Sequence, residues 1–343
     1  MKNKRLLAAS MAFILSAASL TGCSGGNNTT NGSSSGETAS KETNAESAGT
    51  TEAEAPKGEK TVLTVWHTWG AGPGTDAMEK VVEMYNQSND KNVEINLQFV
   101  ANKASGNTQT MDKLMASIAA GNPPEIALLD NFQIPTWAQQ DALVKLDDLM
   151  AASGLSFDGI YDWASNGSHY KDAVYSIPYN GDTRALFYNK DLFAAAGLDP
   201  EDPPSTIEEL NEAAEKLTIM DGNTYKQVGF IPWLNAGKPI YTWGWNFGGD
   251  FYDADTNTLT VAKAENIEAL QWEVDFAEKF GGKSFIEFAN GLGSGAQDAF
   301  VTGQVAMAVR GNFDIANMAQ YNPDLNYGIC PIPSKVEGEH ATW

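Results

Sequence analysis

The side chains of this sequence best suited to bind a ligand are aromatic residues next to predicted loops. Trp66 and Trp69 end the first predicted strand, while Trp243 and Trp245 precede a Gly-Gly-Asp segment. Ligands of α/β sheets bind beyond the carboxyl ends of the strands, so Trp69 is placed at a cleft. Trp66 lies inside an apolar run and is expected in the core. Aromatic residues also fill cores, so we expect about half of those between residues 233 and 245 to serve in packing.

Polar side chains accompany these rings at the ends of predicted strands. The candidates are Asp130, Asn131, Asn180, Asp182, Arg184, Asp250, Arg310 and Asn312. A sugar presents an apolar ring face and a rim of hydroxyls, so rings beside carboxylates, amides and guanidinium groups match what carbohydrate binding requires. Each of these residues can equally be a solvated loop side chain. The pattern therefore favours carbohydrate binding and leaves open which residues take part.

Three short motifs resemble catalytic or nucleotide-binding signatures but lack the necessary context. Residues 32–36 match a nucleophile elbow, yet they lie in a polar segment without a strand or helix pattern. Gly282-Lys283-Ser284 resembles the end of a phosphate-binding loop, but Ala277 replaces the required earlier glycine. The glycine-rich loop at 70–74 lacks a following Lys-Ser or Lys-Thr pair. We expect no catalytic residue and no cofactor.

Charge, cysteine and histidine content exclude further classes of protein. The chain has 22 Lys and Arg against 44 Asp and Glu, a formal net charge of -22, which repels nucleic-acid phosphates. Two cysteines, Cys23 and Cys330, are too few for a disulfide scaffold or a structural zinc site. The three histidines lack the spacing of a zinc-protease motif. Nucleic-acid partners and a metal site are therefore not expected.

The N-terminal region has the features of an exported, anchored protein. A basic start followed by a short apolar stretch at 6–20 predicts a secretory signal over residues 1–22, because the stretch is too short to span a bilayer. The ending Leu-Thr-Gly-Cys resembles a bacterial lipobox, which implies lipidation of Cys23. Residues 24–61 contain no large apolar side chain, so residues 23–61 are predicted to be the lipidated cysteine and a disordered tether.

Strand and helix patterns alternate in the first half of the folded region. Residues 61–68 form an apolar run, residues 93–99 alternate between apolar and polar, and residues 124–130 read as a third strand. Apolar side chains at helical spacing lie between them: Met78, Val81, Val82 and Tyr85, then Met111, Leu114, Met115 and Ile118. This order predicts a β-α-β-α-β unit with a largely parallel sheet.

A second series of elements follows residue 180. Ser205 and Thr206 precede Glu208 and Glu209, a capping pattern that starts a helix whose buried face is Ile207, Leu210, Ala214 and Leu217. Residues 228–234 read as a strand, residues 247–261 as a hairpin, and Ile267, Leu270, Val274 and Ala277 as the buried face of another helix. Because the folded part approaches the size at which chains divide, we expect two lobes. They comprise residues 62–180 with 308–343, and residues 181–307, connected near 178–186 and 305–311.

Several segments in order carry a resemblance to one family. They are TVWHTWG, PPEIALLD, IPYNGDTRALFYNKDLFAAAGLDP, PPSTIEELNEAAEKL, FGGDFYD, FVTGQVAMAVRGNFDIA and NYGICPIP. Together with the lipobox they resemble extracellular solute-binding protein family 1, the carbohydrate receptors of ABC importers, similar to maltose-binding protein. The resemblance implies a two-lobe periplasmic-binding-protein-like α/β fold of type II. Each lobe would be a mostly parallel sheet flanked by helices, and the lobes would close on a sugar.

The resemblance also assigns roles to individual residues. Asp182 matches the acid that binds sugar hydroxyls, and Phe313 falls where the family often has a stacking Trp and offers a smaller platform. The family continues beyond the position of Trp343, so the sequence is expected to be a fragment. The complete set of expected binding residues is His67, Trp69, Asp130, Asn131, Asn180, Asp182, Tyr241, Trp243, Trp245, Asp250, Arg310, Asn312 and Phe313.

The resulting hypothesis is a receptor without catalytic activity. It would be a monomer, anchored by lipid to the extracellular face of the cell membrane, that delivers a sugar to the permease subunits of an ABC importer. One alternative is a surface glycoside hydrolase, which needs two carboxylates about 5 to 10 Å apart, and Asp130 and Asp182 are the candidates. Another is a chemosensory receptor that presents the same ligand to a membrane sensor.

Overall fold

The computed structural model describes residues 60–100, 108–336 and 338–342. The expected signal peptide, Cys23 and nearly all of the expected tether lie outside these residues. Within the described part of the chain, no helix is long and apolar enough to cross a membrane.

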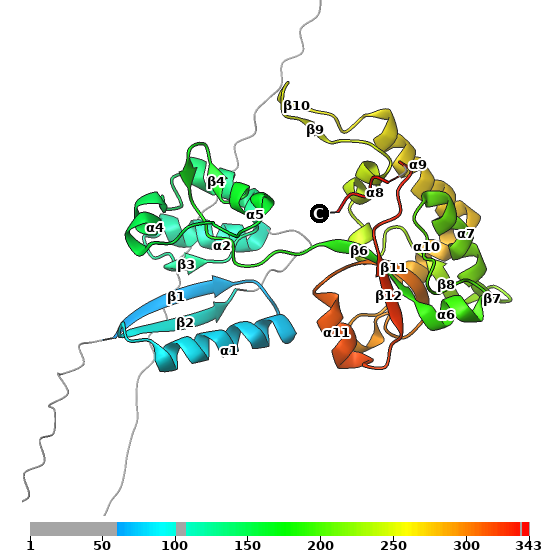
Figure 1. Cartoon of the computed structure of the whole chain (residues 1–343), viewed down its shortest axis with the longest axis horizontal. Coiled ribbons are helices and arrows are strands. Elements are labelled where there is room, and N and C mark those ends of the chain that lie inside the picture. The colour runs from blue at the N-terminus through cyan, green and yellow to red at the C-terminus, as the bar shows by residue number, and fades with distance from the viewer. Residues whose placement is uncertain (1–59, 101–107, 337, 343) are drawn as a thin grey trace, which may run out of the picture. The chain divides into compact units, whose positions relative to one another are not determined.

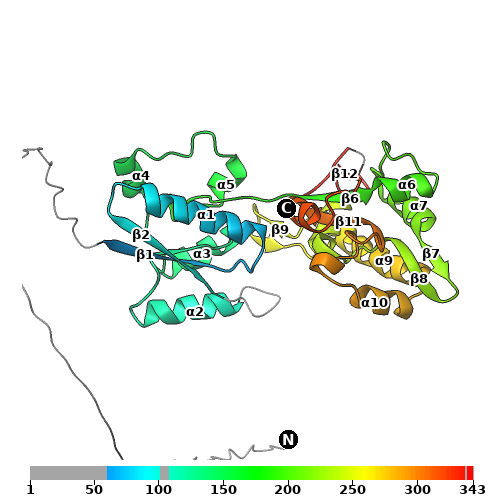
Figure 2. The ribbon, with the colours of Figure 1, turned by 90° about the horizontal axis from the view of Figure 1, so that it is seen from below.

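The first lobe is built on a small parallel sheet. Strand β1 (Thr61–His67) lies between β2 (Val93–Phe99) and β3 (Ile126–Ala127), and both neighbours run parallel to it. Helices α1 (Pro73–Ser88) and α2 (Thr108–Ala119) lie on opposite faces of this sheet (Figures 1 and 2). The predicted β-α-β-α-β unit is therefore confirmed, although the third strand has only two residues.

The rest of the first lobe consists of short elements. These are the 3-10 helix η1 (Asn131–Gln133), helices α3 (Ile134–Gln139), α4 (Asp147–Ser153) and α5 (Asp162–Asn166), and the hairpin of β4 (His169–Tyr170) and β5 (Ala173–Val174). In α1, Met78 is buried as predicted, whereas Val81 and Tyr85 are exposed. The apolar spacing of α1 thus predicts its helical form better than its buried face.

The second lobe contains a five-stranded sheet in the order β12-β6-β11-β8-β7. Its strands are β6 (Arg184–Asn189), β7 (Ile219–Asp221), β8 (Thr224–Phe230), β11 (Val305–Gly311) and β12 (Tyr327–Cys330). Only β8 and β11 pair in parallel, while the other three pairs are antiparallel. The prediction of a mostly parallel sheet thus holds for the first lobe and is wrong for the second, because β6 runs against both of its neighbours.

The sheet also moves the expected lobe boundary. Strands β11 and β12 both pair with β6. Residues 305–330 therefore belong to the second sheet, whereas the sequence prediction assigned residues 308–343 to the first lobe. Residues 305–311, where a second connection is expected, form the strand β11 inside this sheet, and all seven of its residues are buried.

Helix α7 (Ile207–Leu217) shows how local sequence fixes an element. The Thr206 hydroxyl accepts a hydrogen bond from the Glu209 N–H, and the Glu209 carboxylate accepts one from the Thr206 N–H, which completes the predicted capping box. Hydrogen bonds from Ser205 and Thr206 hold the pKa of Glu209 below its ordinary value. The predicted face of Ile207, Leu210, Ala214 and Leu217 is buried. Both predictions for this helix are confirmed.

Helix α9 (Ala264–Lys279) forms where predicted but turns a different face inward. It buries Ala269, Phe276 and Ala277, whereas Ile267, Leu270 and Val274 are about half exposed. Trp272 packs on Trp243 with ring centroids 4.7 Å apart and also contacts Phe276. The aromatic side chains bury more apolar area than the aliphatic ones, so they determine the orientation of the helix.

Glu273 on the same helix makes the stability of the protein depend on pH. Burial raises its pKa from 4.5 to about 7, and its Oε1 atom has no hydrogen-bond partner among the described residues. The folded protein then binds a proton that the unfolded chain releases, so stability falls as the pH rises from 4.5 towards 7. Glu273→Gln should leave the free energy of unfolding unchanged near pH 4 and increase it by about 3 kcal/mol at pH 8.

Urea unfolding at the two pH values measures this effect. Glu265→Gln, an exposed position in the first turn of the same helix, is the control and should change stability by less than about 1 kcal/mol at either pH, the size of its interaction with the helix N-terminus. An equal gain for Glu273→Gln at both pH values would contradict the role of ionisation.

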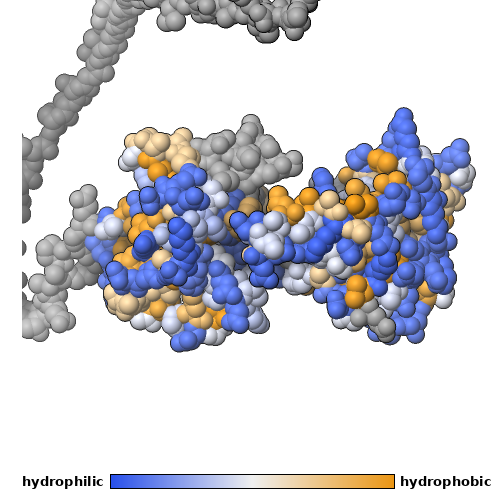
Figure 3. Space-filling model, turned by 90° about the horizontal axis from the view of Figure 1, so that it is seen from above, coloured by the Kyte–Doolittle hydropathy of each residue, from blue (hydrophilic) through white to orange (hydrophobic). Residues whose placement is uncertain are grey.

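The remaining elements of the second lobe surround the sheet. They are helices α6 (Lys190–Ala195), α8 (Ile240–Asn246), α10 (Lys283–Asn290) and α11 (Asp314–Tyr321), the 3-10 helices η2 (Asn235–Gly237) and η3 (Gly295–Gln297), and the predicted hairpin, formed by β9 (Tyr252–Asp253) and β10 (Thr258–Leu259). Figure 3 shows hydrophilic residues spread over the visible surface, with hydrophobic ones scattered among them. This is the surface expected of an acidic, folded chain.

Candidate ligand-binding site

Two predicted aromatic residues meet the segment at residues 179–184, which leads into β6. The ring of Trp69, in the loop after β1, lies 5.8 Å from that of Tyr179. The ring of Phe313, just before α11, lies 5.1 Å from the Arg184 guanidinium. The Asn312 N–H donates a hydrogen bond of 3.1 Å to the Thr183 carbonyl. The segment thus gathers predicted site residues that are far apart in the sequence.

Asp182 provides a carboxylate whose position is fixed in this segment. Its Oδ1 lies 2.8 Å from Arg184 Nη1, and the Asp182 side chain is 40% exposed while that of Arg184 is 9% exposed. Burial raises the pKa of Tyr241, and the charge of Arg184 opposes this shift, so Tyr241 lies within electrostatic reach of Arg184. A buried cation therefore orients a partly exposed acceptor beside two aromatic rings, which suits a ligand with hydroxyl groups.

A cavity of about 520 Å³ lies next to these residues. Its lining includes Ala71, Arg184, Arg310, Phe313, Asn317 and Tyr321. Its size and its mixture of ring faces with polar groups are those of a small-molecule site.

Arg310 lies in this lining but is held by two acids. Its Nη1 lies 2.9 Å from Asp298 Oδ1, its Nε lies 3.3 Å from Asp314 Oδ2, and the residue is only 3% exposed. Its guanidinium also lies 5.5 Å from the Phe300 ring. These contacts favour a structural role for Arg310 over the predicted direct contact with sugar hydroxyls.

The candidates of the first lobe differ in accessibility. His67 is buried against Phe99, with ring centroids 5.8 Å apart, so it lies beneath the surface. Asp130 and Asn131 are exposed at the start of η1, and the Asn131 side chain lies against Gly167 at the end of α5. Asn180 is exposed in the 179–184 segment. Asn131 and Asn180 are therefore accessible to a ligand, while His67 is the buried last residue of the strand that leads to Trp69.

Two predicted binding residues have clear structural roles instead. Trp243 is completely buried, and its indole N–H donates to the carbonyls of Pro232 and Gly237, at 3.0 and 3.1 Å. Because the Trp243 ring is fully enclosed by the core, neither of its faces is open to a ligand. Of the pair Trp243 and Trp245, only Trp245 is partly exposed, and its ring lies 5.0 Å from that of Tyr241.

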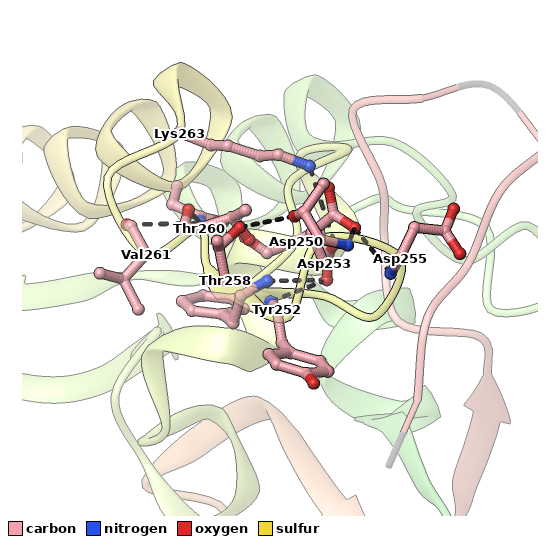
Figure 4. A network of polar contacts seen from close by, with 11 residues as sticks. Asp250, Tyr252, Asp253, Asp255, Thr258, Thr260, Val261 and Lys263 are labelled. Carbon is pink, nitrogen blue, oxygen red and sulfur yellow. Dashed lines mark hydrogen bonds and ion pairs between the residues drawn. The ribbon is translucent and has the colours of Figure 1, made fainter.

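Asp250 anchors the β9–β10 hairpin (Figure 4). Its carboxylate accepts a hydrogen bond of 2.7 Å from the Phe251 N–H and lies 3.7 Å from Lys263 Nζ. Its carbonyl accepts the Thr260 hydroxyl at 3.0 Å. The neighbouring Asp253 accepts the N–H groups of Asp255 and Thr256, which holds its pKa below the ordinary value. This network stabilises a turn, so the role of Asp250 in the structure is local.

Sequence reasoning missed two aromatic residues near the site. Trp163, in α5, lies against Gly181, where an added Cβ would be 2.1 Å from the ring. Tyr161 stacks on Trp163 with ring centroids 6.4 Å apart. The Tyr-x-Trp spacing was the available signal, but it does not reveal that α5 packs against residue 181. Among the described residues, no group of three or more His, Cys, Asp or Glu side chains is placed to hold a metal.

Comparison with known proteins identifies the family of this chain. Residues 71–343 match the model of the bacterial extracellular solute-binding protein family. The chain belongs to this family. CpMnBP1, solved with mannobiose bound, is 35% identical, with 82% of this chain and 71% of that chain covered and a TM-score of 0.71. Its structure with mannotriose bound matches 80% of this chain and 69% of that chain, with a TM-score of 0.69.

A curated member of the solute-binding family is more distant. The sn-glycerol-3-phosphate-binding periplasmic protein UgpB of Escherichia coli is 24% identical over 82% of this chain. The chain spans 63% of the length of that relative. The predicted family and the predicted two-lobe α/β fold are therefore both confirmed.

Proposed function

We propose that this chain is the ligand-binding part of an extracellular receptor that captures a short oligosaccharide for an ABC importer. The observation that carries the proposal is the convergence of Trp69, Phe313 and the Asp182 carboxylate on residues 179–184. Rings bind the apolar faces of a sugar, and an oriented carboxylate accepts its hydroxyl protons. The 35% identity to a protein solved with mannobiose favours a manno-oligosaccharide as the ligand.

The charges around the cavity argue against a phosphorylated ligand such as that of UgpB. Both arginines of the cavity are neutralised, Arg184 by Asp182 and Arg310 by Asp298 and Asp314. A phosphate group would have to displace these carboxylates or lie beside them, and like charges at such distances repel. A neutral ligand with many hydroxyls meets no such cost.

Binding would act through closure of the lobes. A sugar that contacts residues of both lobes stabilises the closed conformation by its higher affinity for that conformation. No chemical step is required, so the receptor would release its ligand unchanged to the permease.

Titration calorimetry on the full-length protein tests this function. Mannobiose and mannotriose are expected to bind with micromolar or tighter dissociation constants, whereas sn-glycerol 3-phosphate gives no heat of binding. Recovery of intact oligosaccharide after prolonged incubation separates a receptor from a hydrolase. Binding of the phosphate ester alone, or cleavage of the sugar, would contradict the proposal.

The same proposal includes a lipid anchor at Cys23, a monomeric state and a place on the extracellular face of the membrane. Its support is the Leu-Thr-Gly-Cys ending followed by a segment without large apolar residues. Two or more acyl chains hold a protein durably at a membrane, which one chain does not. Intact-mass analysis should show acylation that Cys23→Ala removes.

A further inference from the structure

Tyr161 and Trp163 form a pair of near-parallel rings at the start of α5. Their planes differ by 14° and their centroids are 6.4 Å apart. Tyr161 is 76% exposed and Trp163 is 54% exposed. Burying a large aromatic ring is favourable by a few kcal/mol. A ligand or partner that covers these two exposed rings would therefore gain binding free energy.

Backbone contacts hold this pair next to the candidate site. The Trp163 ring occupies the space where a Cβ of residue 181 would lie, so the glycine allows the ring to rest on the backbone directly before Asp182. At the other end of α5, the Asn131 side chain lies against Gly167, with its Nδ2 2.7 Å from the position of an added Cβ. Figure 2 shows α5 beside the segment that leads to β6. Helix α5 is thus packed between two predicted site residues, Asn131 and Asp182.

Trp163 and Phe313 meet the 179–184 segment at different points. Trp163 contacts it at Gly181, and Phe313 contacts it at Arg184. Three residues of extended chain span up to about 10 Å, so the two contacts can lie farther apart than the width of one hexose ring. The two platforms therefore suit neighbouring units of one chain of sugars.

We propose that Tyr161 and Trp163 form an outer sugar-binding platform, so that the ligand is an oligosaccharide of at least two units. One unit is held at Asp182 and Phe313, and the next stacks on the Trp163 ring. This inference rests on the proposed function, and it adds residues that set the length of the ligand.

Calorimetry with mannose, mannobiose and mannotriose on the full-length protein tests the platform. Trp163→Ala should weaken mannotriose binding at least tenfold and leave mannose binding within twofold of wild type. Trp163→Phe, which keeps a ring, should restore most of the loss. Tyr252→Ala, which removes a half-exposed ring from the β9–β10 hairpin, is the matched control and should change neither affinity.

The outcomes separate this inference from the function on which it rests. If wild-type protein binds mannotriose and Trp163→Ala binds it equally well, the outer platform is wrong and the receptor function stands. An equal loss of affinity for all three sugars in Trp163→Ala would also contradict the platform, because it would indicate damage to the site at Asp182 and Phe313. If wild type binds no sugar at any length, the proposed function fails as well.

Discussion

Arg310→Met is expected to lower the free energy of unfolding by about 3 to 5 kcal/mol. The guanidinium is buried between Asp298 and Asp314, at 2.9 and 3.3 Å, inside the central strand β11. Methionine fills similar space but removes the charge, which leaves two carboxylates buried without their cation. Asp298 also accepts the N–H groups of Phe300 and Val301, so it cannot turn away without breaking the loop before β11.

Urea unfolding followed by circular dichroism measures this loss. The control is Lys190→Met, which breaks the ion pair between Lys190 and the exposed Glu201 and should have a much smaller effect. Equal effects of the two substitutions would show that the Arg310 cluster contributes no more than a surface pair.

Asp182→Ala should weaken binding of the preferred sugar by roughly ten- to a hundredfold. The substitution removes an acceptor from a desolvated site, which leaves a ligand hydroxyl unpaired at a cost of about 1 to 3 kcal/mol. It also removes the carboxylate that orients Arg184 beneath the Phe313 ring. Calorimetry on the full-length protein gives the affinity, and Asp172→Ala, at an exposed position between β4 and β5, serves as the control.

Asp182→Asn refines this test. The amide keeps one acceptor and adds N–H donors, so the variant should change the ranking of epimeric sugars as well as the affinity. Unaltered affinity in both Asp182 variants would place the ligand away from residues 179–184.

The parts of the fold that sequence predicts well are those determined by local chemistry. The capping box at Thr206 and Glu209 and the hairpin around residues 252–259 both depend on contacts between residues close in the chain. Family resemblance supplied the rest, including the role expected of Asp182. Patterns of this kind are readable because few other conformations satisfy the same short-range hydrogen bonds.

The buried face of a helix is less predictable when aliphatic and aromatic residues compete. In α9 the aliphatic side chains at helical spacing predicted a buried face of Ile267, Leu270 and Val274, yet Phe276 is buried in the core with Trp243, and the partly buried Trp272 packs against both. Trp243 was predicted to bind the ligand because an aromatic residue can serve either in the core or in a binding site. Whether Trp243 packs in the core or contacts a ligand depends on its neighbours in α8 and α9. The spacing of apolar residues in the sequence does not reveal these neighbours.

Tertiary contacts without a sequence signature account for the missed site residues. Trp163 reaches the site because residue 181 has no side chain, and the two positions are separated by a hairpin. The ion pairs of Arg310 are likewise absent from the sequence pattern. Its acids, Asp298 and Asp314, come from either side of β11 and meet only once the strand is buried.

The pairing of β6 has a mechanical consequence for the connection between the lobes. From Arg184 the chain pairs with β11 on one edge, and from Leu186 it also pairs with β12 on the other edge, so it cannot bend there without breaking a sheet. The proposed rotation between the lobes would then occur in the few residues before it, where Asp182 lies and where Trp69 and Trp163 contact Tyr179 and Gly181. The proposed pivot and the proposed sugar contacts are therefore the same residues, so a bound ligand would restrict rotation at the joint through which it entered.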